Sequence, residues 1–252
     1  MNEEFLDQVN FTKKILTDNG FDLDALTKSD KIYWTKEYAL SLIKEITEVL
    51  DNLDWKKHRK KIEPTLDSNV IEELIDIQKF LWGLMSIWGV DQDLFSNFYW
   101  RKSFVVEERR RCESTKLVKE DKTILLDIDG VLCKYPESFL NWIKLNHPDV
   151  KNLSKRKNAI LWENLKASYR LEGGKRSAIP SDFISEFTNN ARNIGWKIIL
   201  FTHRPVQIYK NIEYDTMFWL KENKVYYDKI VWTSVEKAFY LISDSLQCKI
   251  FI

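Results

Sequence analysis

Two separate groups of acidic residues have the types and spacing that metal-dependent phosphate chemistry needs. The first group is two pairs, Glu45 with Glu48 and Glu73 with Asp76. Residues three apart share a helix face, so two antiparallel helices would bring all four carboxylates together. Four anions that close raise one another's pKa unless a cation lies between them. Magnesium, which prefers oxygen ligands, suits such a site, whereas either pair alone is more typical of a solvated helix surface.

The second group, Asp127 and Asp129 followed by Gly130, ends the apolar run 123–127. Such a run predicts a buried parallel strand, and the chemistry of parallel sheets gathers at the carboxyl ends of their strands. Asp127 could there attack phosphorus, and Asp129, facing the same cleft, could protonate a leaving oxygen. Thr202 and Thr233 end two further predicted strands, so we expect them at the same edge.

The elements that must position these groups change character along the chain. Amphipathic helices are expected at 5–18, 36–53, 69–88 and about 91–110, with turns at Asn19–Gly20 and Ser29–Asp30, a cap at 67–68 and a helix end at Gly89. The third of these helices is apolar almost all round, so Asp76 within it is expected to be buried. After a charged linker at 116–121, predicted strands at 123–127, 197–202, 229–233 and 248–252 alternate with helices at 137–170, 181–194, 206–223 and 234–247. This pattern predicts an all-α domain at 1–111 and an α/β domain with a doubly wound parallel sheet at 116–252.

Composition sets further bounds on the function. The 252-residue chain is 44% hydrophobic, and its formal net charge of +1 argues against a stable nucleic-acid partner. Its cysteines show no metal-ligand spacing and fit reduced thiols in a cytoplasm: Cys112, Cys133 and Cys248. No apolar run is long enough to span a membrane, and the N-terminus lacks the features of a signal peptide.

The pattern Glu-x-x-Glu then Glu-x-x-Asp resembles the all-α nucleoside triphosphate pyrophosphatases (the MazG-like group), especially their dimeric dUTPase and phage dCTPase-dUTPase branch. The resemblance covers roughly residues 1–111 and includes Phe80 and Tyr99. It implies Mg²⁺-dependent hydrolysis of a dNTP, most of all dUTP or dCTP, to dNMP and pyrophosphate. The implied metal ligands are Glu45, Glu48, Glu73 and Asp76, with Glu48 orienting the water, and the implied substrate contacts are Lys56, His58, Lys102 and Arg109. Lys56 and His58 fit a solvated basic surface equally well.

Asp127-x-Asp129-Gly130 after a strand, with Thr202-His-Arg204-Pro205, resembles the haloacid dehalogenase-like (HAD) phosphatases of the 5′-nucleotidase type. The implied roles are Asp127 as nucleophile, Asp129 as acid, Thr202 as phosphoryl binder, Lys237 as charge-balancing lysine and Arg204 as substrate contact, with Mg²⁺ on Asp127 and Asp129. Residues of about 132–180 would form a small helical cap, in which Lys175 and Arg176 either contact a nucleotide phosphate or lie in a solvated loop. The family's fourth acidic motif would be either Asp244 or a residue beyond Ile252. Helical spacing around Asp244 and a strand at 248–252 favour the second, which implies a truncated chain or an impaired metal site.

Together the two resemblances imply a nucleotide-pool hydrolase of phage type, which cuts a dNTP to dNMP and then dephosphorylates a deoxynucleoside monophosphate. The expected setting is a homodimer in the cytoplasm, that of the host if the chain is phage-encoded, acting on small-molecule nucleotides. Three alternatives remain open. In the first, only the pyrophosphatase half is active and the HAD part is structural. In the second, the chain is a non-catalytic dNTP-binding regulator, and in the third it is a phosphatase that processes nucleic-acid ends.

Overall fold

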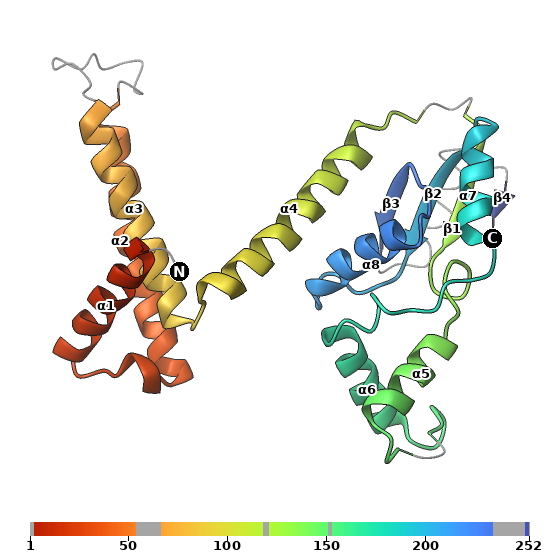
Figure 1. Ribbon diagram of the computed structural model, residues 1–252, viewed down its shortest axis with the longest axis horizontal. Coiled ribbons are helices and arrows are strands. Elements are labelled where there is room, and N and C mark those ends of the chain that lie inside the picture. Colours follow the sequence, from red (N-terminus) through yellow and green to blue (C-terminus); the bar gives the residue numbers. More distant parts are fainter. Residues whose placement is uncertain (1–2, 54–66, 118–120, 151–152, 234–249, 252) are drawn as a thin grey trace. The chain divides into compact units, whose positions relative to one another are not determined.

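The computed structural model describes residues 3–53, 67–117, 121–150, 153–233 and 250–251. It is mostly helical, with a small parallel sheet in the C-terminal part (Figure 1). The contacts divide the chain into two compact units, Met1–Tyr99 and Trp100–Ile252. This division lies within helix α4 (Gln92–Ser114), whose Arg109 and Arg111 bond to Glu213 and to the Tyr227 carbonyl. The domain bounds 1–111 and 116–252 stay predictions. None of the helices in the described ranges is long and apolar enough to cross a membrane.

The first unit contains α1 (Glu3–Asp18), a short 3₁₀ helix (Leu23–Ala25), α2 (Lys28–Asp51) and α3 (Asp67–Ile87). The predicted turn at Ser29–Asp30 is wrong, since both residues lie in the first turn of α2. Thr27 and Asp30 form a capping box: the Thr27 hydroxyl accepts from the Asp30 amide at 3.2 Å, and Asp30 accepts from the Thr27 amide at 2.9 Å. Polar residues that suggested a turn therefore start the helix, because their side chains satisfy its first free amides.

The core of the first unit forms where α1, α2 and α3 meet. It consists of Leu16, Trp34, Tyr38 and Ile87, with partly buried neighbours. At Gly83 the two long helices approach so closely that an added Cβ would lie 2.3 Å from the Tyr38 ring. The predicted helix end at Gly89 is confirmed: this residue has a φ of +68°, and the next amide, of Val90, donates to the Met85 carbonyl at 2.8 Å.

The second unit is built on four parallel strands in the order β3-β2-β1-β4 (Figure 1). They are β1 (Thr123–Asp127), β2 (Lys197–Thr202), β3 (Lys229–Trp232) and β4 (Ile250–Phe251). These positions confirm the four predicted strands. Ile124 and Leu125 pair with Ile250 and Phe251, so the fourth strand follows Asp244 in the chain. Asp244 itself lies outside the described residues.

Helices cover one face of this sheet. Its apolar side chains pack with Cys112 of α4, with Ala191 of α7 (Ile184–Asn193) and with Trp219 of α8 (Asn211–Glu222). On the other face, Leu125, Ile199 and Phe201 pack with Leu117 and Val231. The helix predicted at 234–247 falls outside the described residues, so double winding of the sheet stays a prediction. Helix α8 begins at 211 rather than 206, because the chain first makes a turn in which the Tyr209 amide bonds to the Pro205 carbonyl.

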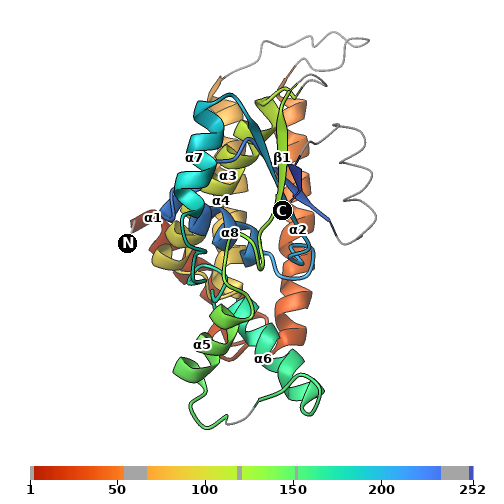
Figure 2. The same cartoon turned by 90° about the vertical axis from the view of Figure 1, so that its right-hand side faces the viewer.

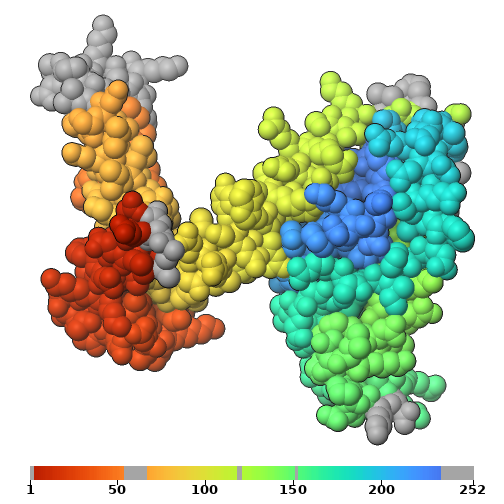
Figure 3. All heavy atoms as spheres, viewed as in Figure 1, coloured from red at the N-terminus to blue at the C-terminus, as the bar shows by residue number. Residues whose placement is uncertain are grey.

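The stretch 137–170, predicted to be helical, contains two helices with a break between them. Helix α5 (Glu137–Asn146) ends before Pro148, whose ring and missing amide hydrogen stop a helix, and α6 (Ala159–Leu171) follows. Their shared core contains Phe139, Trp142, Trp162 and Tyr169. Both ribbon views place the pair beyond the end of β1 (Figure 2), where a cap was expected. On the face shown in Figure 3, the atoms of α5 and α6 form a continuous surface with those of the rest of the second unit.

Candidate functional site

Three of the four acidic residues predicted to converge, on α2 and α3, come together as their spacing predicts; Glu48 is not in this cluster. Carboxylate oxygens of Glu45, Glu73 and Asp76 all lie within 4.8 Å of one another. Glu48 is close enough to act electrostatically on both Glu45 and Glu73, while Lys44 donates a hydrogen bond to it at 2.5 Å. The two pairs therefore face each other across the contact between the helices.

Crowding changes the acidity of these carboxyl groups. Loss of hydration, and then repulsion from Glu48, raise the pKa of Glu45. The same two causes raise the pKa of Glu73. A hydrogen bond from Lys44 instead lowers the pKa of Glu48. A cation placed between the carboxylates would relieve the repulsion that raises the first two.

The donor set fits a magnesium ion. All of the candidate ligands are carboxylate oxygens, which hard divalent cations prefer. Ligands on opposite sides of Mg²⁺ at about 2.1 Å are about 4.2 Å apart, so a small side-chain movement or a bridging water would suffice. The positions that the protein leaves open are those that water and phosphate oxygens usually fill.

One expectation about this site is wrong, and the roles of four further residues stay predictions. The Asp76 side chain is 45% exposed and pairs with Lys79 at 3.2 Å, because the apolar residues around it, such as Ile75 at 49%, are themselves exposed. Lys56 and His58 lie outside the described residues. Lys102 and Arg109 belong to the second unit, where Arg109 pairs with Glu213, so their role at the first site stays a prediction.

The second site lies at the carboxyl ends of β1 and β2. Asp127 ends β1 and lies opposite Phe201 of β2, one residue before Thr202. The Asp127 carboxylate is half-buried and accepts a hydrogen bond from the Ile128 amide at 2.7 Å. Thr202 is buried, and its hydroxyl accepts from the Arg204 amide at 3.2 Å. The sheet thus brings the predicted nucleophile and phosphoryl-binding hydroxyl to one edge.

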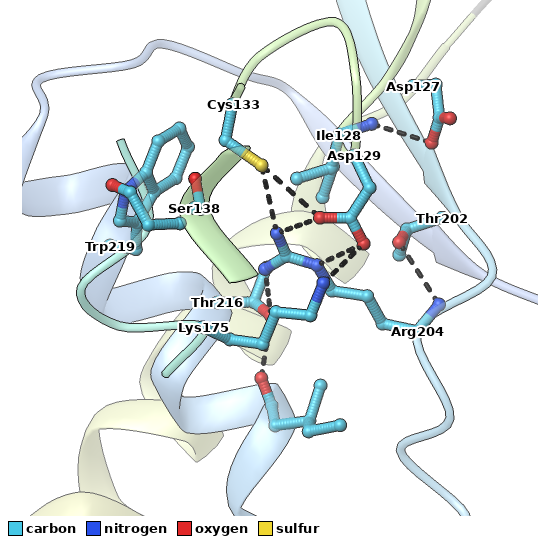
Figure 4. Close-up of polar contacts among 12 residues, drawn as sticks. Asp127, Ile128, Asp129, Cys133, Ser138, Lys175, Thr202, Arg204, Thr216 and Trp219 are labelled. Atoms are coloured by element: carbon cyan, nitrogen blue, oxygen red, sulfur yellow. Dashed lines mark hydrogen bonds and ion pairs between the residues drawn. The ribbon is translucent and has the colours of Figure 1, made fainter. Parts of the chain in front are cut away.

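Asp129 lies at the centre of a network of buried cations (Figure 4). Arg204 binds both of its oxygens, Nη2 to Oδ1 at 2.7 Å and Nε to Oδ2 at 3.1 Å. Lys175 donates to Oδ2 at 2.8 Å, and the Cys133 thiol to Oδ1 at 3.3 Å. Arg204 is held from behind by the Thr216 hydroxyl at 2.8 Å. The network fixes the carboxylate from three separate segments of the chain.

The two aspartates have opposite acidities. Burial raises the pKa of Asp127, and the hydrogen bond from Ile128 only partly offsets it. Burial would raise the pKa of Asp129 as well, but Arg204 and Lys175 outweigh burial and hold that pKa well below its usual range. Asp129 therefore stays ionised while both cations bind it. To donate a proton, it must first lose at least one of them, which an incoming phosphate could attract.

Other expected or overlooked residues complete the site. Lys237 lies outside the described residues, and Thr233 follows β3, with its amide bonded to the Thr202 carbonyl at 3.1 Å. Of the two interpretations of the basic loop, the solvated one is wrong for Lys175, which is 5% exposed. Cys133, whose thiol binds Asp129, was not singled out from the sequence. Its position four residues after Asp129 was the available signal.

Comparisons of the chain with protein-family models, with curated proteins and with solved structures found no match. The two sites therefore rest on their residues and geometry alone.

Proposed function

We propose that this chain is a nucleotide hydrolase with two phosphate-handling sites. Its first unit converts a dNTP, dUTP or dCTP above all, to dNMP and pyrophosphate with Mg²⁺. Its second unit removes the phosphate from a deoxynucleoside monophosphate. The observation that carries the proposal is the cluster of Glu45, Glu73 and Asp76 oxygens within 4.8 Å of one another, on two neighbouring helices.

The geometry supports a division of labour at the first site. Mg²⁺ held there would offset phosphate charge and make an attacking water more acidic. Glu45, Glu73 and Asp76 would hold the ion, because one carboxylate oxygen of each lies within 4.8 Å of the others. Glu48 lies beside them, and its lowered pKa keeps it ionised, so it would orient the water by accepting a hydrogen bond from it.

The second site supports hydrolysis of a phosphate ester. The Asp127 carboxylate would attack phosphorus, forming an aspartyl-phosphate as the bond to the leaving oxygen breaks. Thr202, at the same end of the sheet, would hold a phosphoryl oxygen, while Arg204, the expected substrate contact, would keep Asp129 beside it. Asp129 would protonate the leaving oxygen once phosphate has drawn a cation away from it.

Product analysis tests both activities. Five dNTPs with Mg²⁺ would be offered to wild type, Glu48→Gln and Asp127→Asn, with products separated by liquid chromatography. We expect monophosphate and pyrophosphate from wild type and Asp127→Asn but not from Glu48→Gln. Nucleoside should form with wild type and be lost in Asp127→Asn. Glu37→Gln, an exposed acid on the same helix α2, is the matched control.

The other hypotheses predict different results, two of which need a dNTP-binding assay and a phosphorylated polynucleotide beside this experiment. Monophosphate that accumulates in wild type would mean that only the pyrophosphatase half is active. Binding of dNTP without turnover would mean a regulator. Release of phosphate only from polynucleotide ends would mean an end-processing enzyme.

The proposed setting is a homodimer in a cytoplasm, without a stable nucleic-acid partner. Apolar side chains along α2 and α3 support self-association, since Leu40 and Ile43 are 64% and 59% exposed and Ile71 is 55% exposed. Sedimentation of the full chain at several concentrations measures this directly, and a monomer at all of them would rule the dimer out.

A further inference from the structure

Lys175 is buried although it lies in a loop of the cap. It follows Gly173 and Gly174, directly after α6, and its side chain is 7% exposed. Gly173 has a φ of +79°, and a Cβ on Gly174 would lie 2.0 Å from the Tyr169 ring. The two glycines therefore let the backbone run against Tyr169, which directs the lysine inward (Figure 4).

The surroundings of Lys175 are unusual for an ammonium group. Its Nζ donates to Asp129 Oδ2 at 2.8 Å and lies over the rings of Tyr135 and Tyr169, at 5.0 and 5.6 Å from their centres. Burial, and then the charge of Arg204, lower the pKa of Lys175 to about 8. Lysine is almost never buried without a strong reason, and one carboxylate shared with an arginine is weak compensation.

Charges in this part of the structure do not balance. Asp129 contributes one negative charge, whereas Arg204 and Lys175, which both bind it, contribute two positive charges. Asp127 and Asp215 also lie within the electrostatic reach of Arg204 and bring the negative charges to three. Arg101 and Arg176 approach Asp215 at 3.7 and 3.6 Å, so four positive charges still face them. The Asp129 side chain is still 25% exposed, so an anion can reach the group. An excess buried cation next to an accessible edge is typical of a site for an anionic ligand.

We propose that Lys175 is a phosphate-binding cation of the second site, supplied by the cap rather than by the sheet. It would bind an oxygen of a phosphate monoester while Arg204 keeps Asp129 in place, so phosphate binds fully only when the cap lies on the sheet. This rests on the proposed phosphatase function and adds a substrate contact that the cap must deliver. The apolar walls of Tyr135 and Tyr169 would strengthen the contact by excluding water.

Lys175→Met tests the proposal, because it keeps the length and burial of the side chain and removes its charge. A charge-assisted hydrogen bond is worth roughly a tenfold to hundredfold change in binding, so we expect the KM for a deoxynucleoside monophosphate to rise by about that factor. Binding of inorganic phosphate, measured by calorimetry without turnover, should weaken equally, and Lys175→Arg should restore part of it. Arg192→Met, which removes an exposed arginine of α7 that lies over the Tyr226 ring, is the control.

A purely structural lysine gives a different result. Lys175→Met would then lower the melting temperature while KM and phosphate affinity stay at the wild-type values, which overturns the proposal but leaves the phosphatase function standing. Wild type that binds phosphate through Lys175 but hydrolyses no monophosphate would support the contact and overturn the phosphatase function. Wild type that does neither overturns both. Should Lys175→Met fail to fold, Gly174→Ala displaces the same loop while keeping the lysine, and unchanged phosphate binding in that variant contradicts the proposal.

Discussion

Arg204→Met should destabilise the second unit strongly, because Arg204 is 3% exposed and makes three hydrogen bonds to Asp129 and Thr216. Removing one partner of a buried ion pair costs about 3–5 kcal/mol, and the remaining Lys175 places the expected loss near about 3 kcal/mol. With a urea dependence of about 2 kcal/mol per molar, the midpoint should fall by about 1.5 M. Hydrogen exchange of the peptides that contain β1 and β2, followed through a urea series, reports on this unit alone.

Two comparisons make that result decisive. Arg192→Met removes an arginine that stacks on Tyr226 and should change the midpoint little, as surface substitutions usually do. The folded-state pKa of Asp129 lies below its unfolded value. Its contribution to the free energy of unfolding is therefore present above about pH 4 and is lost as the pH falls further. The difference between wild type and Arg204→Met should therefore narrow below about pH 4. Equal midpoints for Arg204→Met and Arg192→Met at pH 7 would refute the reasoning.

Three further predictions concern the first unit. Mg²⁺ at a hundredfold its dissociation constant should stabilise it by about 2.7 kcal/mol in calorimetry, an effect that Glu45→Gln or Glu73→Gln removes and Glu37→Gln keeps. Without metal, the raised pKa values of Glu45 and Glu73 mean that these carboxyl groups bind more protons in the folded unit than in the unfolded one. The stability of the unit should therefore rise as the pH falls from 7 towards 5. A melting temperature that does not rise over this range would contradict the repulsion between these carboxylates. Gly83→Ala should lower the stability by about 1–3 kcal/mol in urea unfolding, because its Cβ would overlap the Tyr38 ring, and an unchanged midpoint would show that the helices can separate freely.

Local patterns in the sequence predicted much of the fold. The apolar runs ending in Asp127 and Thr202 are the strands β1 and β2, and the short run at the C-terminal end supplies β4. The ends of elements were predicted less well where side-chain hydrogen bonds to the backbone decide them. Thr27 and Asp30 start a helix instead of a turn because they bond to each other's backbone. The extent of α4 was predicted closely, but its packing was not, because Arg109 pairs with Glu213, which is 104 residues away in the chain.

At the candidate sites, too, features set by local spacing were predictable, and features set by distant residues were not. Glu45 and Glu73 were predictable as partners because helical spacing places each on a known face. The low pKa of Asp129 was not predictable, because it depends on Lys175 and Arg204, which are 46 and 75 residues away in sequence. Burial of Lys175 depends on how closely the glycine loop approaches Tyr169, and a single sequence carries no direct sign of that approach.

A ³¹P NMR time course of the full chain with Mg²⁺ and dUTP or dCTP tests the central claim most directly. The account predicts that the triphosphate resonances are replaced by those of monophosphate and pyrophosphate, and that the monophosphate signal then decays as orthophosphate appears. Glu45→Gln should stop the first step, and Asp127→Asn only the second. Triphosphate that stays intact in wild type, or that yields diphosphate and orthophosphate instead of pyrophosphate, would contradict it.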